Sequence, residues 1–311
     1  MSFLSQYGLF LLKAFTVVLS ILVVFGGIIA LGRKHRPKLE IHSLNKEYDA
    51  LKKRLFHDIK NEKPQKKKKK NKAGPSLFVL DFQGDIKASQ AEQLEEAITA
   101  VLTVADAKDE VLVRLESPGG AVSGYGLAAS QLQRLRDKGI PLTVSIDKIA
   151  ASGGYLMACV ANKILAAPFA IIGSIGVVAQ LPNFHRWLKK NNIDIELLTA
   201  GEYKRTLTLF GENTEKGREK FQEDLEKIHE AFRSYVFTNR SQLDIDAVAT
   251  GEHWLASDAL SLKLVDQLTT SADYLMEKMA DWNCFHITVQ GKKSLLDKLL
   301  KPAMKLLHPF A

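Results

Sequence analysis

Asp147-Lys-Ile-Ala-Ala-Ser-Gly-Gly-Tyr155 is the stretch that points most directly to a fold and a chemistry, because Ser152 stands between small residues and a glycine pair. The glycine pair is suited to begin a helix. At such a strand-to-helix turn, free backbone N–H groups and the positive end of the helix dipole stabilise an oxyanion beside the serine. The stretch therefore predicts that Ser152 is a nucleophile and that the Gly153 amide is one donor of an oxyanion hole.

A second glycine pair follows another apolar run. Val111-Leu-Val113 leads into Glu116-Ser-Pro-Gly-Gly120, and glycines at such a turn allow the backbone to approach a substrate carbonyl closely. Gly120 is therefore the second candidate donor of the oxyanion hole. A serine nucleophile also needs a base, but Ser152 lies in no Gly-x-Ser-x-Gly elbow and has no suitable histidine nearby in the sequence.

Lysine is the remaining candidate for the base. Lys204 follows an expected strand at 193–198, and a lysine acts as a base near pH 7 only where its surroundings lower its pKa from about 10.4. Ser174 lies in a very apolar run, where its hydroxyl needs a hydrogen-bond partner, and we expect it to orient Lys204. The structural alternatives are a helix start for Ser152, a solvated charge for Lys204 and a satisfied core hydroxyl for Ser174.

Four motifs in a fixed order make the chain resemble a known family. They are Ser117-Pro-Gly-Gly120, Ala151-Ser-Gly-Gly-Tyr155, Gly173-Ser-Ile-Gly-Val177 and Gly201-Glu-Tyr-Lys-Arg205. Together they resemble the signal peptide peptidase A and SohB family of membrane serine proteases, over roughly residues 76–270. One departure is Lys263, where the family usually has a glycine, so the end of the local helix is in question.

The resemblance implies a ClpP/crotonase-like α/β domain and a Ser-Lys dyad. Carried over by position, it makes Ser152 the nucleophile, Lys204 the general base, Ser174 the serine beside that lysine, and Gly120 and Gly153 the oxyanion-hole residues. It also implies a ring-shaped homo-oligomer, in which Ser152 of one subunit meets Lys204 of its neighbour.

Composition fits one catalytic domain with appendages rather than a disordered chain. The 311 residues are 46% hydrophobic and 25% charged, with a net charge of +8. Residues 33–72 alone hold 16 Lys/Arg and 5 Asp/Glu. Because the positive excess lies in this segment, nothing supports nucleic-acid binding by the catalytic domain.

The pattern of apolar residues alternates between strands and helices. We expect strands at 77–82, 111–115 and 142–146, with helices from a Ser89/Glu92 capping box to about 104, at 125–138 and from Ser152 onward. A longer helix is expected at 214–240, and an amphipathic helix at 41–59. This alternation is typical of an α/β domain.

The uncharged run from Ala14 to Leu31 predicts a single membrane-spanning helix. A cleaved signal peptide is the competing interpretation, but the basic cluster follows the apolar run instead of preceding it. The expected location is therefore the bacterial cell inner membrane. Arg33, Lys34 and Arg36 place the catalytic domain in the cytoplasm by the positive-inside rule, although signal peptide peptidase relatives work on the opposite side.

Four segments follow from these patterns: an anchor at 1–32, a basic linker with an amphipathic helix at 33–75, a protease domain at 76–290 and a basic amphipathic tail at 291–311. The lysine-rich part of the linker is either solvated or in contact with anionic lipid. The tail fits membrane contact and subunit contact equally well.

Metal and cofactor motifs are not found in the sequence. It has no His-Glu-x-x-His and no Cys-x-x-Cys, so we expect neither a metal nor a cofactor. Cys159 and Cys284 give no sign of a disulfide.

The resulting hypothesis is a membrane-anchored serine endopeptidase acting on membrane-derived or signal-peptide-like peptides. The alternatives are a crotonase-like acyl-CoA enzyme and a catalytically silent membrane scaffold.

Overall fold

The computed structural model describes residues 3–32, 38–60 and 74–290. The chain divides into two compact units, residues 39–289 and the remaining residues at the two ends. The lysine run at 66–70 and the expected tail at 291–311 lie outside the described residues.

Helix α1 (Phe3–Gly32) contains the uncharged run for which the sequence predicts a membrane-spanning helix. Among the described residues, however, no helix has both the length and the apolar character needed to cross a membrane. The structure therefore does not support the expected spanning helix.

Seven strands form the main sheet in the order β1-β10-β2-β3-β4-β6-β9, and the pairs from β10 to β9 are all parallel. The strands are β1 (Lys38–Ser43), β2 (Ser76–Gln83), β3 (Glu110–Glu116), β4 (Leu142–Ile146), β6 (Lys163–Ala166), β9 (Gln267–Leu268) and β10 (Asn283–Gln290). The predicted α/β class and the strands at 77–82, 111–115 and 142–146 are confirmed.

Alternate residues of β2 enter two separate cores. Phe78, Leu80 and Phe82 belong to the larger core with α3 (Ala91–Leu102) and α4 (Val122–Asp137), whereas Leu77 and Val79 belong to the smaller core with α10 (Ser271–Lys278). Because successive side chains of a strand point to opposite faces, both faces of the sheet are covered. This burial explains why the strands read as nearly continuous apolar runs.

A smaller sheet of three strands positions the loops around Ser152. Its members are β5 (Ile149–Ala151), β7 (Ile171–Gly173) and β8 (His253–Leu255), with β5 and β7 parallel and β7 and β8 antiparallel. A β-bridge between Ser117 and Ala150 joins this sheet to the end of β3. The helix α5 (Gly153–Ala158) begins directly after β5.

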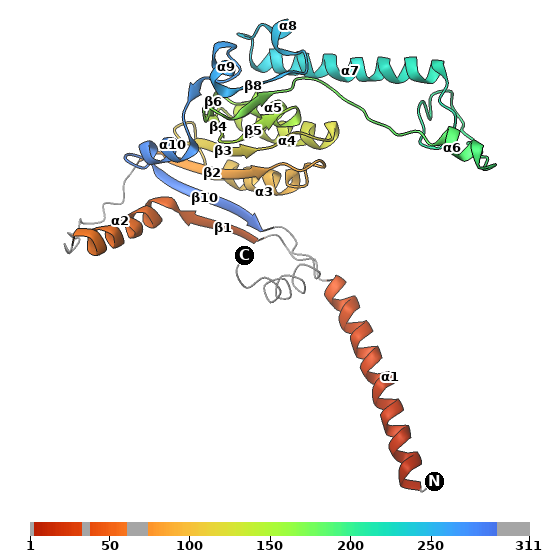
Figure 1. The fold of residues 1–311 in the computed structure, drawn as a ribbon. Helices are drawn as coiled ribbons and strands as arrows, with labels where there is room; N and C mark the ends of the chain where they lie inside the picture. Colours follow the sequence, from red (N-terminus) through yellow and green to blue (C-terminus); the bar gives the residue numbers. More distant parts are fainter. Residues whose placement is uncertain (1–2, 33–37, 61–73, 291–311) are drawn as a thin grey trace. The chain divides into compact units, whose positions relative to one another are not determined.

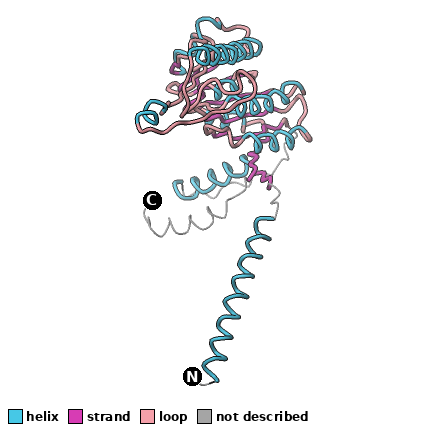
Figure 2. Tube along the Cα trace, turned by 90° about the vertical axis from the view of Figure 1, so that its right-hand side faces the viewer, coloured by secondary structure: helices cyan, strands magenta, loops and turns pink. Residues whose placement is uncertain are grey.

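The remaining helices are α2 (Leu44–Lys60), α6 (His185–Lys190), α7 (Glu215–Asn239), α8 (Ile245–Val248) and α9 (Ala256–Ser261). The predicted long helix at 214–240 is confirmed as α7, and the Thr214 side chain caps it by accepting a hydrogen bond from the Gly217 amide. Long loops connect β7 to α6 and α6 to α7 (Figures 1 and 2). The strand expected at 193–198 is wrong, because this stretch is an exposed loop with no strand beside it.

The amphipathic helix expected at 41–59 begins later than predicted. Residues 38–43 form β1, an edge strand of the main sheet, and α2 starts at Leu44. Asn45 ties this turn to the domain, because its side-chain amide donates to the Trp282 carbonyl and its oxygen accepts from the Cys284 amide. The compact unit that contains this turn begins at Leu39.

Two helix ends differ from the expectation in instructive ways. The Ser89/Glu92 capping box is wrong, because the Ser89 hydroxyl donates to Asp85 Oδ2 and α3 begins after Gln90 without a side-chain cap. At the end of α9, Lys263 adopts φ 63°. Lys263 therefore takes the left-handed conformation that usually favours glycine, and α9 ends at Ser261.

Candidate active site

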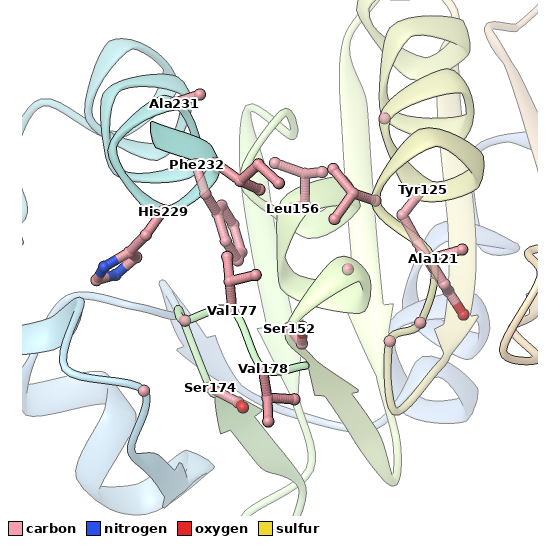
Figure 3. Close-up of a pocket in the computed structure, with 18 of the residues that line it drawn as sticks. Ala121, Tyr125, Ser152, Leu156, Ser174, Val177, Val178, His229, Ala231 and Phe232 are labelled. Atoms are coloured by element: carbon pink, nitrogen blue, oxygen red, sulfur yellow. The ribbon is translucent and has the colours of Figure 1, made fainter. Parts of the chain in front are cut away.

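Ser152 occupies a sharp turn between β5 and α5. Its backbone has φ 52° and ψ −119°, a combination that costs on the order of 1–3 kcal/mol and needs support from its surroundings. That support includes a 2.8 Å hydrogen bond from the Ser152 amide to the Gly173 carbonyl and a 2.9 Å bond from the Leu156 amide to the Ser152 carbonyl. The turn leaves the Ser152 side chain half-buried at the edge of a cavity (Figure 3).

The loop after β3 packs directly against this turn. A Cβ atom added at Gly119 would lie 2.7 Å from the Cβ of Ser152 and 2.8 Å from the nitrogen of Gly153. Gly119 also has φ 90°, which favours glycine. The glycines of the Ser-Pro-Gly-Gly motif therefore allow this loop to pack closely against Ser152, as the sequence predicted.

The amides of Gly120 and Gly153 are free to bind a ligand. Neither donates a hydrogen bond to another residue in the described part of the chain, and both residues line the cavity beside Ser152. The intervening Gly119 amide, by contrast, donates to Ser117 Oγ at 3.1 Å. Because the Gly119 amide already has a partner, the Gly120 amide is the one in this glycine pair that can donate to a substrate oxygen.

A buried hydrogen-bond network supports the Gly119 turn. The Tyr125 hydroxyl donates to the Asp85 carbonyl at 2.9 Å and lies 2.6 Å from Ser117 Oγ. Because the Tyr125 hydroxyl donates its hydrogen to the Asp85 carbonyl, it can only accept from Ser117. The Ser117 hydroxyl therefore donates to Tyr125 and accepts a hydrogen bond from the Gly119 amide. Burial raises the pKa of Tyr125, so its phenol keeps the proton that this direction requires.

Tyr125 also supports the second candidate oxyanion donor. A Cβ atom at Gly153 would lie 2.4 Å from the Tyr125 ring, so the ring and the glycine are in close contact. Sequence reasoning missed Ser117 and Tyr125. The available signals were the position of Ser117 directly before Pro-Gly-Gly and of Tyr125 as the one aromatic residue of α4.

The cavity has a volume of about 1290 Å³ and brings together Ser152, Ser174, Gly120 and Gly153. Much of its wall is apolar, and Figure 3 shows Leu156, Val177 and Phe232 around the space next to Ser152. Polar groups on the α7 side come from Lys227 and His229. The arrangement suits an apolar ligand with a polar group, such as a carbonyl, at Ser152.

Ser174 lies on the loop that follows β7. It has φ 52°, its amide donates to the Glu252 carbonyl at 2.6 Å, and its carbonyl accepts from the Gly176 amide. His229 Nε2 lies 3.2 Å from the carbonyl oxygen of Ile175, the next residue. These contacts hold the half-buried Ser174 side chain at the cavity.

Lys204 is the one predicted site residue that this chain does not bring to the cavity. It lies on the exposed loop between α6 and α7, its side chain is exposed, and its amide donates to the Gly201 carbonyl at 3.2 Å. It is absent from the lining of the cavity that contains Ser152. Within one chain, therefore, the structure assembles the serine and the two amides without the lysine.

Among the described residues, no group of three or more His, Cys, Asp or Glu side chains is arranged to hold a metal ion. Cys159 and Cys284 are both buried and unbridged. Burial raises the pKa of the Cys159 thiol to about 12, against a smaller opposing effect of Arg240. A buried thiol of this kind is unreactive near neutral pH.

Family models match nearly the whole chain. Residues 2–132 match the model described as peptidase family S49 N-terminal, and residues 134–284 match the one described as peptidase family S49.

Similar proteins include the probable protease SohB of Haemophilus influenzae, 49% identical over 96% of this chain and 93% of that protein. The probable protease SohB of Buchnera aphidicola subsp. Schlechtendalia chinensis is 49% identical over 89% of this chain and all of that protein. A solved structure, the 1510-N membrane protease specific for a stomatin homolog from Pyrococcus horikoshii, is 14% identical, with a TM-score of 0.43 over 75% of this chain and all of that chain. From the family models and the two SohB relatives, we conclude that the chain belongs to peptidase family S49.

Proposed function

We propose that this peptidase is a serine endopeptidase in which Ser152 is the nucleophile and Lys204 the general base. The observation that carries the proposal is the strained turn at Ser152 beside the two unpartnered amides of Gly120 and Gly153. Strain of this kind gathers at functional sites, and free amides beside a nucleophile suit a developing oxyanion.

The proposed reaction is acyl transfer in two steps. Neutral Lys204 takes the proton from Ser152 Oγ, which attacks the peptide carbonyl while the Gly120 and Gly153 amides hold the oxyanion. The lysine then gives its proton to the leaving amine, and an acyl ester remains on Ser152. Water, deprotonated by the same lysine, attacks the ester and releases the carboxylic acid product and the free serine.

We infer that Lys204 reaches Ser152 of a neighbouring copy of the chain in a ring-shaped homo-oligomer. The position of Lys204 supports this inference. It lies on the exposed loop after α6, outside the cavity that contains Ser152 of the same chain. The loops on both sides of α6 also expose apolar side chains, with Val178 and Leu198 at 90% and 91% of their surface. Apolar surface of this kind is characteristic of interfaces, and burial in the interface would favour the neutral lysine. Ser174 would then orient Lys204 from the neighbouring copy.

The proposed substrates are extended peptides with small or apolar side chains, such as those released from membranes or signal peptides. Apolar cavity walls from Leu156, Val177 and Phe232 support this class. An extended peptide could also pair with strand edges near the site.

We also propose attachment to the bacterial cell inner membrane through α1. The sequence supports this, because the run from Ala14 to Leu31 has no charged residue and is long enough for a membrane-spanning helix. Arg33, Lys34 and Arg36 favour a cytoplasmic catalytic domain. Protease added to intact spheroplasts tests the side, because removal of the catalytic domain would contradict a cytoplasmic location.

Mixed oligomers test the dyad. Ser152→Ala and Lys204→Ala chains are each expected to be inactive, and Lys189→Ala, which changes an exposed lysine of α6, is the matched control with full activity. If each site combines two chains, random equal mixing should restore about a quarter of the activity. No recovery in verified mixed rings would contradict a shared site, and an active Lys204→Ala chain would remove the lysine from the mechanism.

A further inference from the structure

Helix α2 has an apolar stripe that nothing in the described structure covers. Tyr48, Leu51, Leu55 and Ile59 recur at steps of three and four, so they lie on one face of the helix. Their exposed fractions are 40%, 55%, 48% and 75%. An isolated helix of this length is marginal in water, so a partner for this stripe would stabilise it.

Only the first turn of α2 is held by the domain. Leu44 packs on the smaller core. The Asn45 side chain donates to the carbonyls of Met279 and Trp282 and accepts a hydrogen bond from the Cys284 amide. The rest of α2 extends away from β1 (Figure 1). The domain therefore fixes where the helix starts but leaves its apolar stripe available.

The charge around the stripe indicates the partner. With 100° per residue, Lys52 lies at one edge of the stripe, and Arg54, Glu47 and Asp58 lie at the other. Arg54 is paired with Asp58 at 3.9 Å, whereas neither Lys52 nor Lys53 has a carboxylate partner among the residues that the structure describes. The sequence on both sides of α2 is also basic, at 33–38 and 66–70. The positive excess of these two flanking segments is complementary to an anionic lipid surface, on which the apolar stripe can also insert.

We propose that α2 lies in the head-group region of an anionic bilayer, with the stripe from Tyr48 to Ile59 inserted and with Lys52 and Arg54, at its two edges, near the lipid phosphates. Long basic side chains reach such phosphates while their stems stay among apolar groups. If α1 is anchored as proposed above, residues 33–43 span at most about 40 Å, so α2 stays within reach of the membrane. This surface goes beyond the proposed peptidase chemistry and does not depend on Ser152.

Hydrogen exchange of the full chain in lipid nanodiscs tests this binding. Amides of 48–59 should exchange more slowly in discs of phosphatidylcholine with phosphatidylglycerol than in discs of phosphatidylcholine alone. Each basic residue near an anionic surface contributes about fivefold to binding, so the double variant Lys52→Glu/Arg54→Glu should weaken it by about 25-fold or more. The matched control Lys108→Glu/Lys138→Glu, which changes exposed lysines outside α2, should keep the protection.

Two results would overturn the proposal. Equally fast exchange in both kinds of disc would mean that anionic lipid does not cover the stripe. Equally slow exchange in both discs and in detergent would indicate a protein partner, and a chain ending at Gln290 would then distinguish its own C-terminal segment from a second copy. The Ser152→Ala chain should keep the lipid-dependent protection, so failure of the peptidase mechanism is separately visible.

Discussion

Replacing Tyr125 by phenylalanine tests the network beneath the candidate oxyanion hole. The ring stays against Gly153, but the Ser117 hydroxyl loses its acceptor at 2.6 Å and the Asp85 carbonyl loses its donor at 2.9 Å. Ser117 is fully buried, whereas Asp85 is exposed and can bind water. One buried polar group left without a partner costs about 1–3 kcal/mol, which corresponds to a fall in Tm of roughly 2–12 °C for a domain of this size.

The assay is thermal unfolding of detergent-solubilised Tyr125→Phe, Ser117→Ala and the double variant, with the rate of Ser152 acylation measured in parallel. If the two hydroxyls form one hydrogen bond, the double variant loses less stability than the two single losses combined, by about 1 kcal/mol. Acylation should slow by about tenfold, because loss of a complete oxyanion donor costs a hundredfold or more. Additive losses with an unchanged acylation rate would refute the network.

Three further predictions concern the scaffold. Burial raises the pKa of Asp81, but hydrogen bonds from His286 and Arg114 outweigh it and hold the pKa at about 2. Its stabilising contribution is therefore complete above the usual value of 3.8 and is lost as the pH falls toward 2, so Asp81→Asn should flatten the acid-unfolding curve in that window. Lys263→Gly should raise the unfolding free energy by up to about 1 kcal/mol, because glycine relieves the left-handed backbone, whereas Lys263→Ala should bring no gain in urea unfolding. Arg240→Met should destabilise the fold by about 1–3 kcal/mol in the same assay, because Arg240 is 3% exposed and its partner Asp266, whose side chain is 31% exposed, would lose two hydrogen bonds.

Local sequence was most informative where burial is uniform. The apolar runs at 111–113 and 142–146 could be predicted as strands because the parallel sheet buries both of its faces. The turn at Ser152 was predictable from its glycine pair, and so was the approach of the 117–120 loop. In these places the local residue types, apolar runs for buried strands and glycines for tight turns, are enough to predict the backbone geometry.

Tertiary contacts account for what sequence reasoning missed. The stretch 193–198 has the composition of a strand, but no neighbouring strand pairs with it and it remains an exposed loop. Ser89 gives its hydrogen bond to Asp85 instead of capping α3. Ser117 and Tyr125 meet only because the end of β3 and the first turn of α4 fold around the same loop, which no local pattern reveals.

The most direct test of the central claim is covalent labelling of the purified full chain with a fluorophosphonate, followed by mass spectrometry of the adduct. A serine nucleophile activated by a lysine predicts one adduct at Ser152 that disappears in both Ser152→Ala and Lys204→Ala, while Lys189→Ala is labelled normally. A correctly assembled chain that takes no label at Ser152 would contradict the proposed mechanism and favour a catalytically silent scaffold.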